Sequence, residues 1–128
     1  MADNALAKKL KLTGRKKPAV INAPPGYDLG VATKLSGKHD WILLFVKNKA
    51  ELEKTAGNVA AALEPDAMLW ISFPKGSSKI QTDLTRDKGW EVLPKLDLKW
   101  VTLVSVDDTW SAFGLRPYKP GEERQNWR

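Results

Sequence analysis

Two stretches of the chain, 41–46 and 67–73, are apolar at nearly every position and show no alternation of apolar and polar residues. They read WILLFV and AMLWISF. This pattern is typical of strands that are covered on both faces, in the middle of a sheet with helices above and below it. We therefore expect the two strands to lie side by side inside a largely parallel sheet.

The segment between these two stretches has the pattern of an amphipathic helix. Asn48 is a suitable N-cap, and Glu51, three residues later, completes a capping box. The apolar residues that follow are three or four positions apart, as on one helix face: Leu52, Ala56, Val59, Ala60 and Leu63. Pro65 and Asp66 mark the expected end of this helix. A strand–helix–strand unit of this kind predicts parallel strands joined by a right-handed crossover.

Weaker patterns predict further elements on either side. A short amphipathic helix is expected over 5–12, where leucines lie among lysines, and a first buried strand is expected over 18–21. Segment 27–38 fits a loop, a helical turn or a weak strand. A second helix is expected to begin at Thr82 or Asp83. Its inward-facing residues would be Leu84, Trp90 and Leu93.

Two alternating stretches, 100–106 and 109–116, flank a turn signal at Asp107 and Asp108. They predict a hairpin that ends the sheet with an antiparallel edge strand. The alternation places Val101, Leu103 and Ser105 on one face of the first stretch, with Trp100, Thr102, Val104 and Val106 on the other. All these elements together predict an α/β fold, a Rossmann-like three-layer sandwich with a mostly parallel sheet.

The charge of the chain is concentrated near its N-terminus. The chain has 128 residues and a net charge of +6, from 21 Lys and Arg against 15 Asp and Glu. Residues 1–17 contain six of these cations and one acid, a net of +5. We therefore divide the chain into a basic arm (1–17), one α/β domain (18–117) and a tail (118–128). A basic arm can bind nucleic acid or an acidic partner, or it can serve only to keep the protein in solution.

Composition also excludes several kinds of site. The chain has no cysteine, and therefore no disulfide or thiolate metal site. Its single histidine, His39, excludes multi-histidine metal clusters and is expected in an exposed loop. Carboxylates alone could bind Mg²⁺ or Ca²⁺, but no spacing indicates such a site. No apolar run approaches the ~20 residues of a membrane span, and the N-terminus lacks an apolar signal core, so we expect a cytoplasmic protein without membrane contact.

The loop after the second apolar strand is the first candidate binding site. It contains Lys75, Gly76, Ser77 and Ser78, and lies between a strand and an expected helix N-terminus with Thr82. Backbone amides, hydroxyls and ammonium groups in such a place can bind a phosphate or a carboxylate. The order of residues is not that of a phosphate-binding P-loop. The alternative is a connection in which small residues only permit a turn.

Two further groups are expected at the same edge of the sheet. Arg86, close to Asp83 and Asp87, can bind an anionic ligand or simply form ion pairs within the first turn of the helix. Asp108 and Trp110 reach this edge if the strand that precedes them runs parallel to its neighbours. The Trp110 ring then either stacks on a planar ligand or packs in the core.

Several short segments of the sequence resemble a known bacterial family of domains of unknown function. They are DWILLFV, LWISFPKGSS, TDLTRD and VDDTWSAFGLRP, and the resemblance covers roughly residues 6–117. That family has no established activity, so the resemblance implies a fold only. More distantly, the order of elements resembles the second half of an S-adenosylmethionine-dependent methyltransferase. Methyltransferases have a glycine-rich cofactor loop after the first strand, whereas this chain has NAPPG at 22–26, so no cofactor is expected.

Three functional hypotheses follow from the sequence. The first is a non-catalytic domain that binds a protein partner or an anionic small molecule at the edge formed by 74–86 and 107–110. The second is an enzyme, either a reduced methyltransferase or a protein acting on phosphate esters. The third is nucleic-acid binding through the arm. The first hypothesis requires Lys75 and Trp110 to lie on the same rim, and the oligomeric state stays open.

Overall fold

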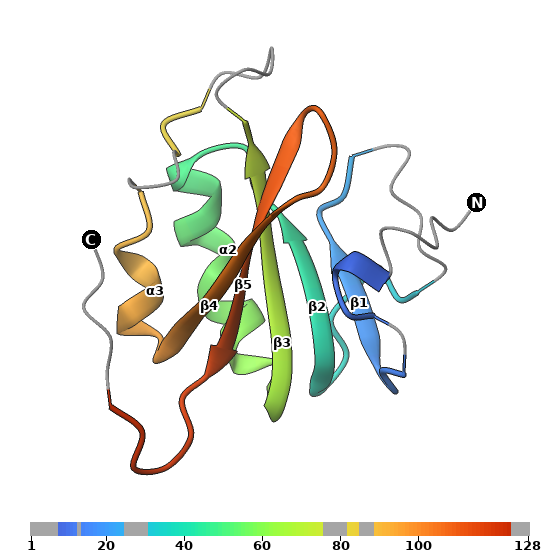
Figure 1. The fold of residues 1–128 in the computed structure, drawn as a ribbon, viewed down its shortest axis with the longest axis vertical. Coiled ribbons are helices and arrows are strands. Elements are labelled where there is room, and N and C mark those ends of the chain that lie inside the picture. Colours follow the sequence, from blue (N-terminus) through green and yellow to red (C-terminus); the bar gives the residue numbers. More distant parts are fainter. Residues whose placement is uncertain (1–7, 13, 25–30, 76–81, 85–88, 124–128) are drawn as a thin grey trace.

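A computed structural model describes residues 8–12, 14–24, 31–75, 82–84 and 89–123. Its elements, in chain order, are β1 (Pro18–Ile21), β2 (His39–Phe45), α2 (Lys49–Ala61), β3 (Leu63–Pro74), α3 (Val92–Lys95), β4 (Leu98–Ser105) and β5 (Trp110–Pro117). No helix within these ranges is long and apolar enough to span a membrane. Figure 1 shows one twisted sheet with its strands in the centre of the molecule.

The five strands form one sheet in the order β1-β2-β3-β5-β4. The first three are parallel, and residues of the two apolar strands are partners, as in Leu43 with Trp70. This confirms that the two apolar stretches lie side by side. Asn48 caps α2 through the amide of Glu51, as expected, and α2 connects β2 to β3. The predicted α/β, Rossmann-like fold is therefore confirmed.

The C-terminal hairpin differs from the prediction in the order of its strands. The antiparallel strand β5 is not at the edge: it lies between β3 and β4, and both neighbours pair with it antiparallel. The edge strand β4 consequently runs in the same direction as β3. As the inner strand, β5 has five of its eight residues buried, whereas only one residue of the edge strand β4 is buried. Apolar content could not predict this order, because β4 has at least as many apolar residues as β5.

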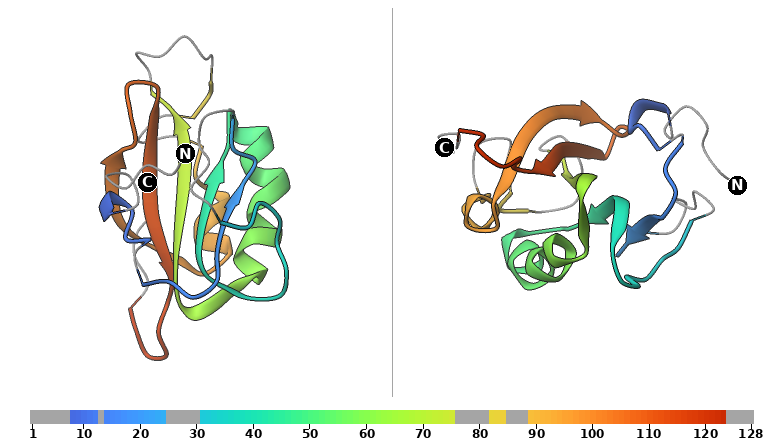
Figure 2. Two further views of the ribbon diagram at one scale, coloured as in Figure 1. Left: turned by 90° about the vertical axis from the view of Figure 1, so that its right-hand side faces the viewer. Right: turned by 90° about the horizontal axis from the view of Figure 1, so that it is seen from below.

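Each face of the sheet has its own hydrophobic core. On one face, α2 and α3 cover the sheet, as Figure 2 shows, and the aromatic rings of Phe73, Trp90 and Phe113 pack together with centroids 4.7–5.4 Å apart. On the other face, Leu10 packs over residues of β2 and β3 that include Trp41 and Trp70. The third layer of the sandwich is thus a short N-terminal segment.

This N-terminal segment, predicted as an arm, is packed into the domain over its described residues. Leu10 is fully buried, and its carbonyl oxygen accepts hydrogen bonds from the indole nitrogens of Trp41 (2.8 Å) and Trp70 (2.7 Å). The carboxylate of Asp40 accepts hydrogen bonds from the backbone amides of Lys16 (2.7 Å) and Lys17 (2.8 Å). Two separate anchors therefore attach this segment to the sheet.

The boundaries around α2 and α3 also differ from the prediction. Leu63 belongs to β3 and not to α2, which ends at Ala61. Its spacing from Val59 continues the helical period, but its backbone pairs with His39. Residues 82–84 are not helical, and the helix that buries Leu93 is only Val92–Lys95. Gly89, at φ +101°, has a backbone conformation that a continuous helix does not allow.

An irregularity in β4 reverses part of the predicted alternation. The register shifts between Trp100 and Thr102, so Val101 is an extra residue in the strand. Trp100 pairs with Leu115 and Leu103 pairs with Phe113, and both partners belong to the core under α2. Trp100 and Leu103 therefore lie on the same face, whereas strict alternation would separate them. A bulge of this kind shifts the side chains by one position.

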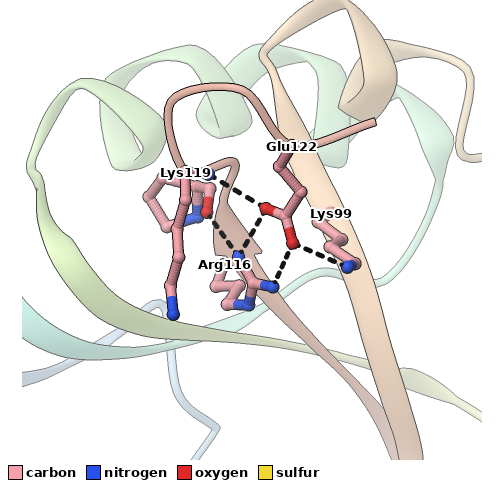
Figure 3. Close-up of polar contacts among 5 residues, drawn as sticks. Lys99, Arg116, Lys119 and Glu122 are labelled. Atoms are coloured by element: carbon pink, nitrogen blue, oxygen red, sulfur yellow. Dashed lines mark hydrogen bonds and ion pairs between the residues drawn. The ribbon is translucent and has the colours of Figure 1, made fainter. Parts of the chain in front are cut away.

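The described part of the tail is docked against the hairpin. The carboxylate of Glu122 accepts hydrogen bonds from both terminal nitrogens of Arg116 (2.9 and 2.6 Å), from Lys99 Nζ (2.8 Å) and from the amide of Lys119 (2.9 Å), as Figure 3 shows. The first three contacts are charge-assisted and join the tail to both strands of the hairpin. Residues 118–123 of the tail are therefore docked on the hairpin.

Candidate functional site

The end of β3 and the β4–β5 turn form one rim of the molecule. The backbone amide of Lys75 donates to the carbonyl oxygen of Thr109 at 2.8 Å, and Pro74 pairs with Trp110. Figure 1 shows the tip of the hairpin beside the end of β3. Lys75 and Trp110 therefore lie on the same rim, as the first hypothesis requires. The parallel direction of β3 and β4 brings their carboxyl ends together.

Two lysine side chains converge at this rim on one residue, Ser105. The ammonium nitrogen of Lys75 lies 2.6 Å from the Ser105 hydroxyl oxygen, and that of Lys9 lies 2.8 Å from the Ser105 carbonyl oxygen. Ser105 is the last residue of β4 and is exposed. The contribution of Lys9 was missed by the sequence analysis, because it depends on how Leu10 anchors the N-terminal segment on the sheet.

The carboxylate of Asp107 organises the turn next to these lysines. Its Oδ1 accepts hydrogen bonds from the amides of Thr109 (2.8 Å) and Trp110 (2.9 Å). The amide of Val106 donates to the Trp110 carbonyl at 2.9 Å and closes the turn. Asp107 therefore holds the backbone that positions Ser105, while Asp108 is exposed at the turn. Both aspartates form the turn that the sequence predicts.

The remaining predicted site residues have varied positions. Trp110 is only 3% exposed and packs edge-to-face on Phe45 at a centroid distance of 5.1 Å, so of the two alternatives for its ring the structure shows core packing. The Thr82 hydroxyl accepts a hydrogen bond from the amide of Leu84 at 3.0 Å. Gly76, Ser77, Ser78 and Arg86 lie outside the described residues.

Side chains of the protein itself occupy the end of β1, where methyltransferases have their cofactor loop. Asn22, in the left-handed conformation at φ +63°, donates from its side-chain amide to the carbonyl of Phe45 (2.8 Å) and to the carboxylate of Glu51 (2.6 Å). Asn tolerates this conformation better than most residues. The side chain therefore joins the end of β1 to the end of β2 and to the first turn of α2.

The N-terminus of α2 is capped in the same way. The carboxylate of Glu51 also accepts from the amide of Lys47 at 3.2 Å, and that of Asp83 accepts from the amide of Lys49 at 2.7 Å. Negative side chains at this end of a helix compensate its dipole. Asp83, predicted in the first turn of its own helix, caps α2 instead. An external anion would have to displace these carboxylates.

His39 is buried, and the prediction of an exposed loop histidine is wrong. Its side chain is 1% exposed, its Nε2 accepts a hydrogen bond from the amide of Ser36 (2.9 Å), and its Nδ1 lies 3.0 Å from the carbonyl oxygen of Lys17. These partners require the proton on Nδ1. The ring joins β2 to the segments on either side of β1, which explains its burial.

No cluster of three or more potential metal-ligating side chains is present in the part of the chain that the structure describes. No protein-family model matches the sequence. No curated protein shows significant sequence similarity to it either.

Solved structures with a similar fold include two methyltransferases and the protein LepI. A ribosomal protein L11 methylase from Lactobacillus delbrueckii subsp. bulgaricus is similar with a TM-score of 0.59 and 13% identity, over 88% of this chain and 78% of that one. LepI, in complex with SAM, has a TM-score of 0.55 and 10% identity, over 90% of this chain and 40% of LepI. The mitomycin 7-O-methyltransferase MmcR has a TM-score of 0.55 and 10% identity, over 89% of this chain and 54% of MmcR.

These similarities concern the fold, because all the identities are low. The chain spans less than two thirds of LepI and of MmcR. The region similar to this chain is thus only part of each of those proteins. The chain has a Rossmann-like α/β fold of the methyltransferase type.

Proposed function

We propose that this protein is a non-catalytic Rossmann-like domain that binds an anionic small molecule at the rim formed by Lys75 and the β4–β5 turn. The observation that carries the proposal is the convergence of Lys9 and Lys75 on Ser105, at 2.8 and 2.6 Å. Lys9 and Lys75 bring two positive charges to the same residue, and like charges repel each other. An anion bound between them removes this repulsion and gains charge-assisted hydrogen bonds.

The chemistry of the rim favours a phosphate or carboxylate group. A lysine ammonium is a compact point charge with three donors, and it binds phosphate and carboxylate groups through charge-assisted hydrogen bonds. Asp107 lies two residues after Ser105, and its Oδ1 accepts hydrogen bonds from two backbone amides of the turn.

The state of His39 supports a binding role and not a catalytic one. It is the single histidine of the chain, and histidine is the most common general base at neutral pH. Both of its ring nitrogens have partners inside the protein. Its ring is held within the sheet and is not at the rim.

A second candidate is S-adenosylmethionine binding, as in a reduced methyltransferase. Its support is the fold shared with the L11 methylase and with LepI, whose structure contains SAM. Against it stand Asn22 and Glu51, which occupy the end of β1 where a cofactor loop would be. Binding there would require the bond between these two side chains to open.

Thermal unfolding with added ligands tests the proposal. We expect pyrophosphate or ATP at millimolar concentration to raise the unfolding temperature of the wild type, because a ligand that binds only the folded state stabilises it, by about 2.7 kcal/mol at one hundred times its Kd. The double variant Lys9→Met, Lys75→Met should lose this shift. The control Lys47→Met, Lys54→Met, at exposed positions outside the rim, has the same net charge and should keep it.

The outcomes separate the two candidates. A shift that survives in the Lys9, Lys75 variant, or a wild type that no anion stabilises, would refute binding at the rim. S-adenosylmethionine is included as a ligand. If it stabilises the wild type, and the rim variant equally, the methyltransferase-like candidate replaces the first one.

A further inference from the structure

The described residues before His39 carry cations and no acids. Within 8–12, 14–24 and 31–38, the charged side chains are Lys8, Lys9, Lys11, Arg15, Lys16, Lys17, Lys34 and Lys38. These are eight of the 21 cations of the chain, so all other residues together contribute 13 cations against 15 acids, a net of −2. The positive charge of the protein therefore comes entirely from this part.

The fold gathers these residues at one side of the molecule, which we call the basic flank (8–12, 14–17 and 34–38). Figure 1 shows the N-terminal turn, β1 and the segment before β2 together on the right of the sheet, and Figure 2 shows this side facing the viewer. The amide of Val20 donates to the carbonyl of Ala32 at 2.8 Å, and Lys17 Nζ donates to the carbonyl of Ser36. The segment 31–38 thus lies directly beside β1 and the residues that precede it.

The backbone of the basic flank is held in place by the rest of the protein. Leu10 anchors the first turn in the core, and Asp40 binds the amides of Lys16 and Lys17. Burial acts to raise the pKa of the Asp40 carboxyl, but these two amide bonds and the charge of Arg15 outweigh it and hold the pKa below its ordinary value. Asp40 therefore stays ionised and directed at the backbone. A preorganised backbone reduces the entropy lost on binding.

The basic flank lacks the apolar side chains that other kinds of partner need. Among the described residues, the exposed large hydrophobic side chains are Trp100 (40%) and Val101 (39%), both on β4 at the opposite edge of the sheet. Protein interfaces depend on buried aromatic or aliphatic anchors, and stable membrane binding needs apolar insertion. Nucleic-acid interfaces are more polar and strongly positive, and their phosphate contacts come largely from lysine and arginine.

We propose that the basic flank binds the phosphate backbone of nucleic acid. Lysines predominate among its cations, and as point charges they position phosphates without reading bases. Binding is therefore expected to be independent of sequence and strongly dependent on salt. The basic flank and the rim share Lys9. The test variant below leaves Lys9 and Lys75 unchanged, so either proposal can fail without the other.

Fluorescence anisotropy with a labelled 20-base-pair duplex tests the proposal on the full chain. The test variant is Lys8→Gln, Lys11→Gln, Lys16→Gln, Lys34→Gln, four exposed lysines of the basic flank. Each lost phosphate contact should weaken binding about tenfold at ~0.1 M salt and reduce the slope of log affinity against log salt by roughly 0.9. The matched control is Lys47→Gln, Lys54→Gln, Lys95→Gln, Lys119→Gln, four exposed lysines elsewhere with the same change in net charge.

We expect the test variant to lose most of its affinity and the control to retain it, with Lys75→Met unchanged. Equal losses in both quadruple variants would mean that net charge alone attracts the duplex, and would overturn the proposal. So would a wild type that does not bind at 50 mM salt. A polyglutamate peptide that competes as well as unlabelled duplex at equal charge would instead identify an acidic protein as the occupant. Thermal unfolding confirms that each variant is folded.

Discussion

The indole nitrogen of Trp70 lies 2.7 Å from the carbonyl oxygen of Leu10, a residue 60 positions earlier in the chain. The same oxygen accepts a hydrogen bond from Trp41 at 2.8 Å. A carbonyl oxygen has two lone pairs, and here two core tryptophans from neighbouring strands use them. Since each buried indole N–H needs a partner, the N-terminal segment is a necessary part of this face of the domain.

Truncation of Leu10 should therefore destabilise the whole domain. We expect Leu10→Ala to lower the free energy of unfolding by about 2–5 kcal/mol, because the fully buried side chain leaves a cavity above Trp41 and Trp70. Leu12→Ala, at a half-buried position, should cost clearly less. Urea unfolding followed by tryptophan fluorescence measures both. Equal stability of Leu10→Ala and the wild type would mean that the segment does not dock in solution.

A methyl group at Gly114 should be poorly tolerated. A Cβ there would lie 2.6 Å from Met68 Cε and 2.8 Å from Trp70 Cζ3. Met68 can move, but the Trp70 ring is held by its bond to Leu10, so we expect Gly114→Ala to cost roughly 1–3 kcal/mol. Gly57, inside α2 with open space around it, is the matched control. Gly57→Ala should stabilise the protein by about 0.5–1 kcal/mol, since alanine favours helix. Thermal unfolding of the two variants should therefore show opposite signs.

The stability of the hairpin and tail should depend on acid pH through Glu122. Hydrogen bonds from Arg116, followed by those from Lys99 and the Lys119 amide, hold the pKa of Glu122 far below its ordinary value of 4.5. A carboxyl group with a lowered pKa in the folded state contributes its full stabilisation above the ordinary value. That contribution is lost as the pH falls below 4.5 towards the lowered pKa.

The unfolding temperature measured between pH 7 and pH 2 checks this prediction. The wild type should exceed Glu122→Gln at neutral pH, and the difference should shrink as the pH falls. Glu123→Gln, an exposed neighbour, provides the control and should follow the wild type. A constant difference between wild type and Glu122→Gln across the whole range would show that the ionised carboxylate is not the source of the stability.

Removal of the Ser72 hydroxyl is a change that we do not expect to lower the stability of the protein. Among the described residues it is a fully buried side-chain oxygen without a hydrogen-bond partner, in the strand β3 between Phe45 and Ala112. A buried hydroxyl without a partner costs free energy. We expect Ser72→Ala to leave stability unchanged or to raise it by roughly 1 kcal/mol, whereas Thr82→Val should lower it by about that amount because the Leu84 amide loses its acceptor. Clear destabilisation by Ser72→Ala in urea unfolding would reveal a partner for this oxygen.

Much of the fold could be predicted because its signals are local. The uniform apolar pattern of 41–46 and 67–73 predicts two inner strands, and Asn48 with Glu51 predicts the start of α2. The same approach placed Leu63 in the helix, since Leu63 continues the helical spacing of Val59. It also placed β5 at the edge of the sheet. The apolar pattern of a strand indicates that its faces are covered, but not which strands lie on either side of it.

The candidate site could be predicted only in part. The strand and loop order predicts that Lys75 and the turn at Asp107 share a rim, which is confirmed. The second lysine, Lys9, could not be predicted, because 96 residues separate it from Ser105 and no local pattern relates them. The burial of His39 was missed because one of its partners, Lys17, lies 22 positions earlier in the chain.

By itself, the sequence determined the five strands, the helix α2, the turn at Asp107 and Asp108, and that positive charge accumulates before residue 39. These properties depend on backbone preferences and on the apolar period of neighbouring residues, which act over a few positions. Only the tertiary structure decided that β5 lies between β3 and β4, that Leu10 accepts two indole hydrogen bonds, and that Lys9 reaches Lys75 at Ser105. Each of these features is a contact between residues that are far apart in the sequence. Such contacts are set by the packing of the whole core, which no local pattern describes.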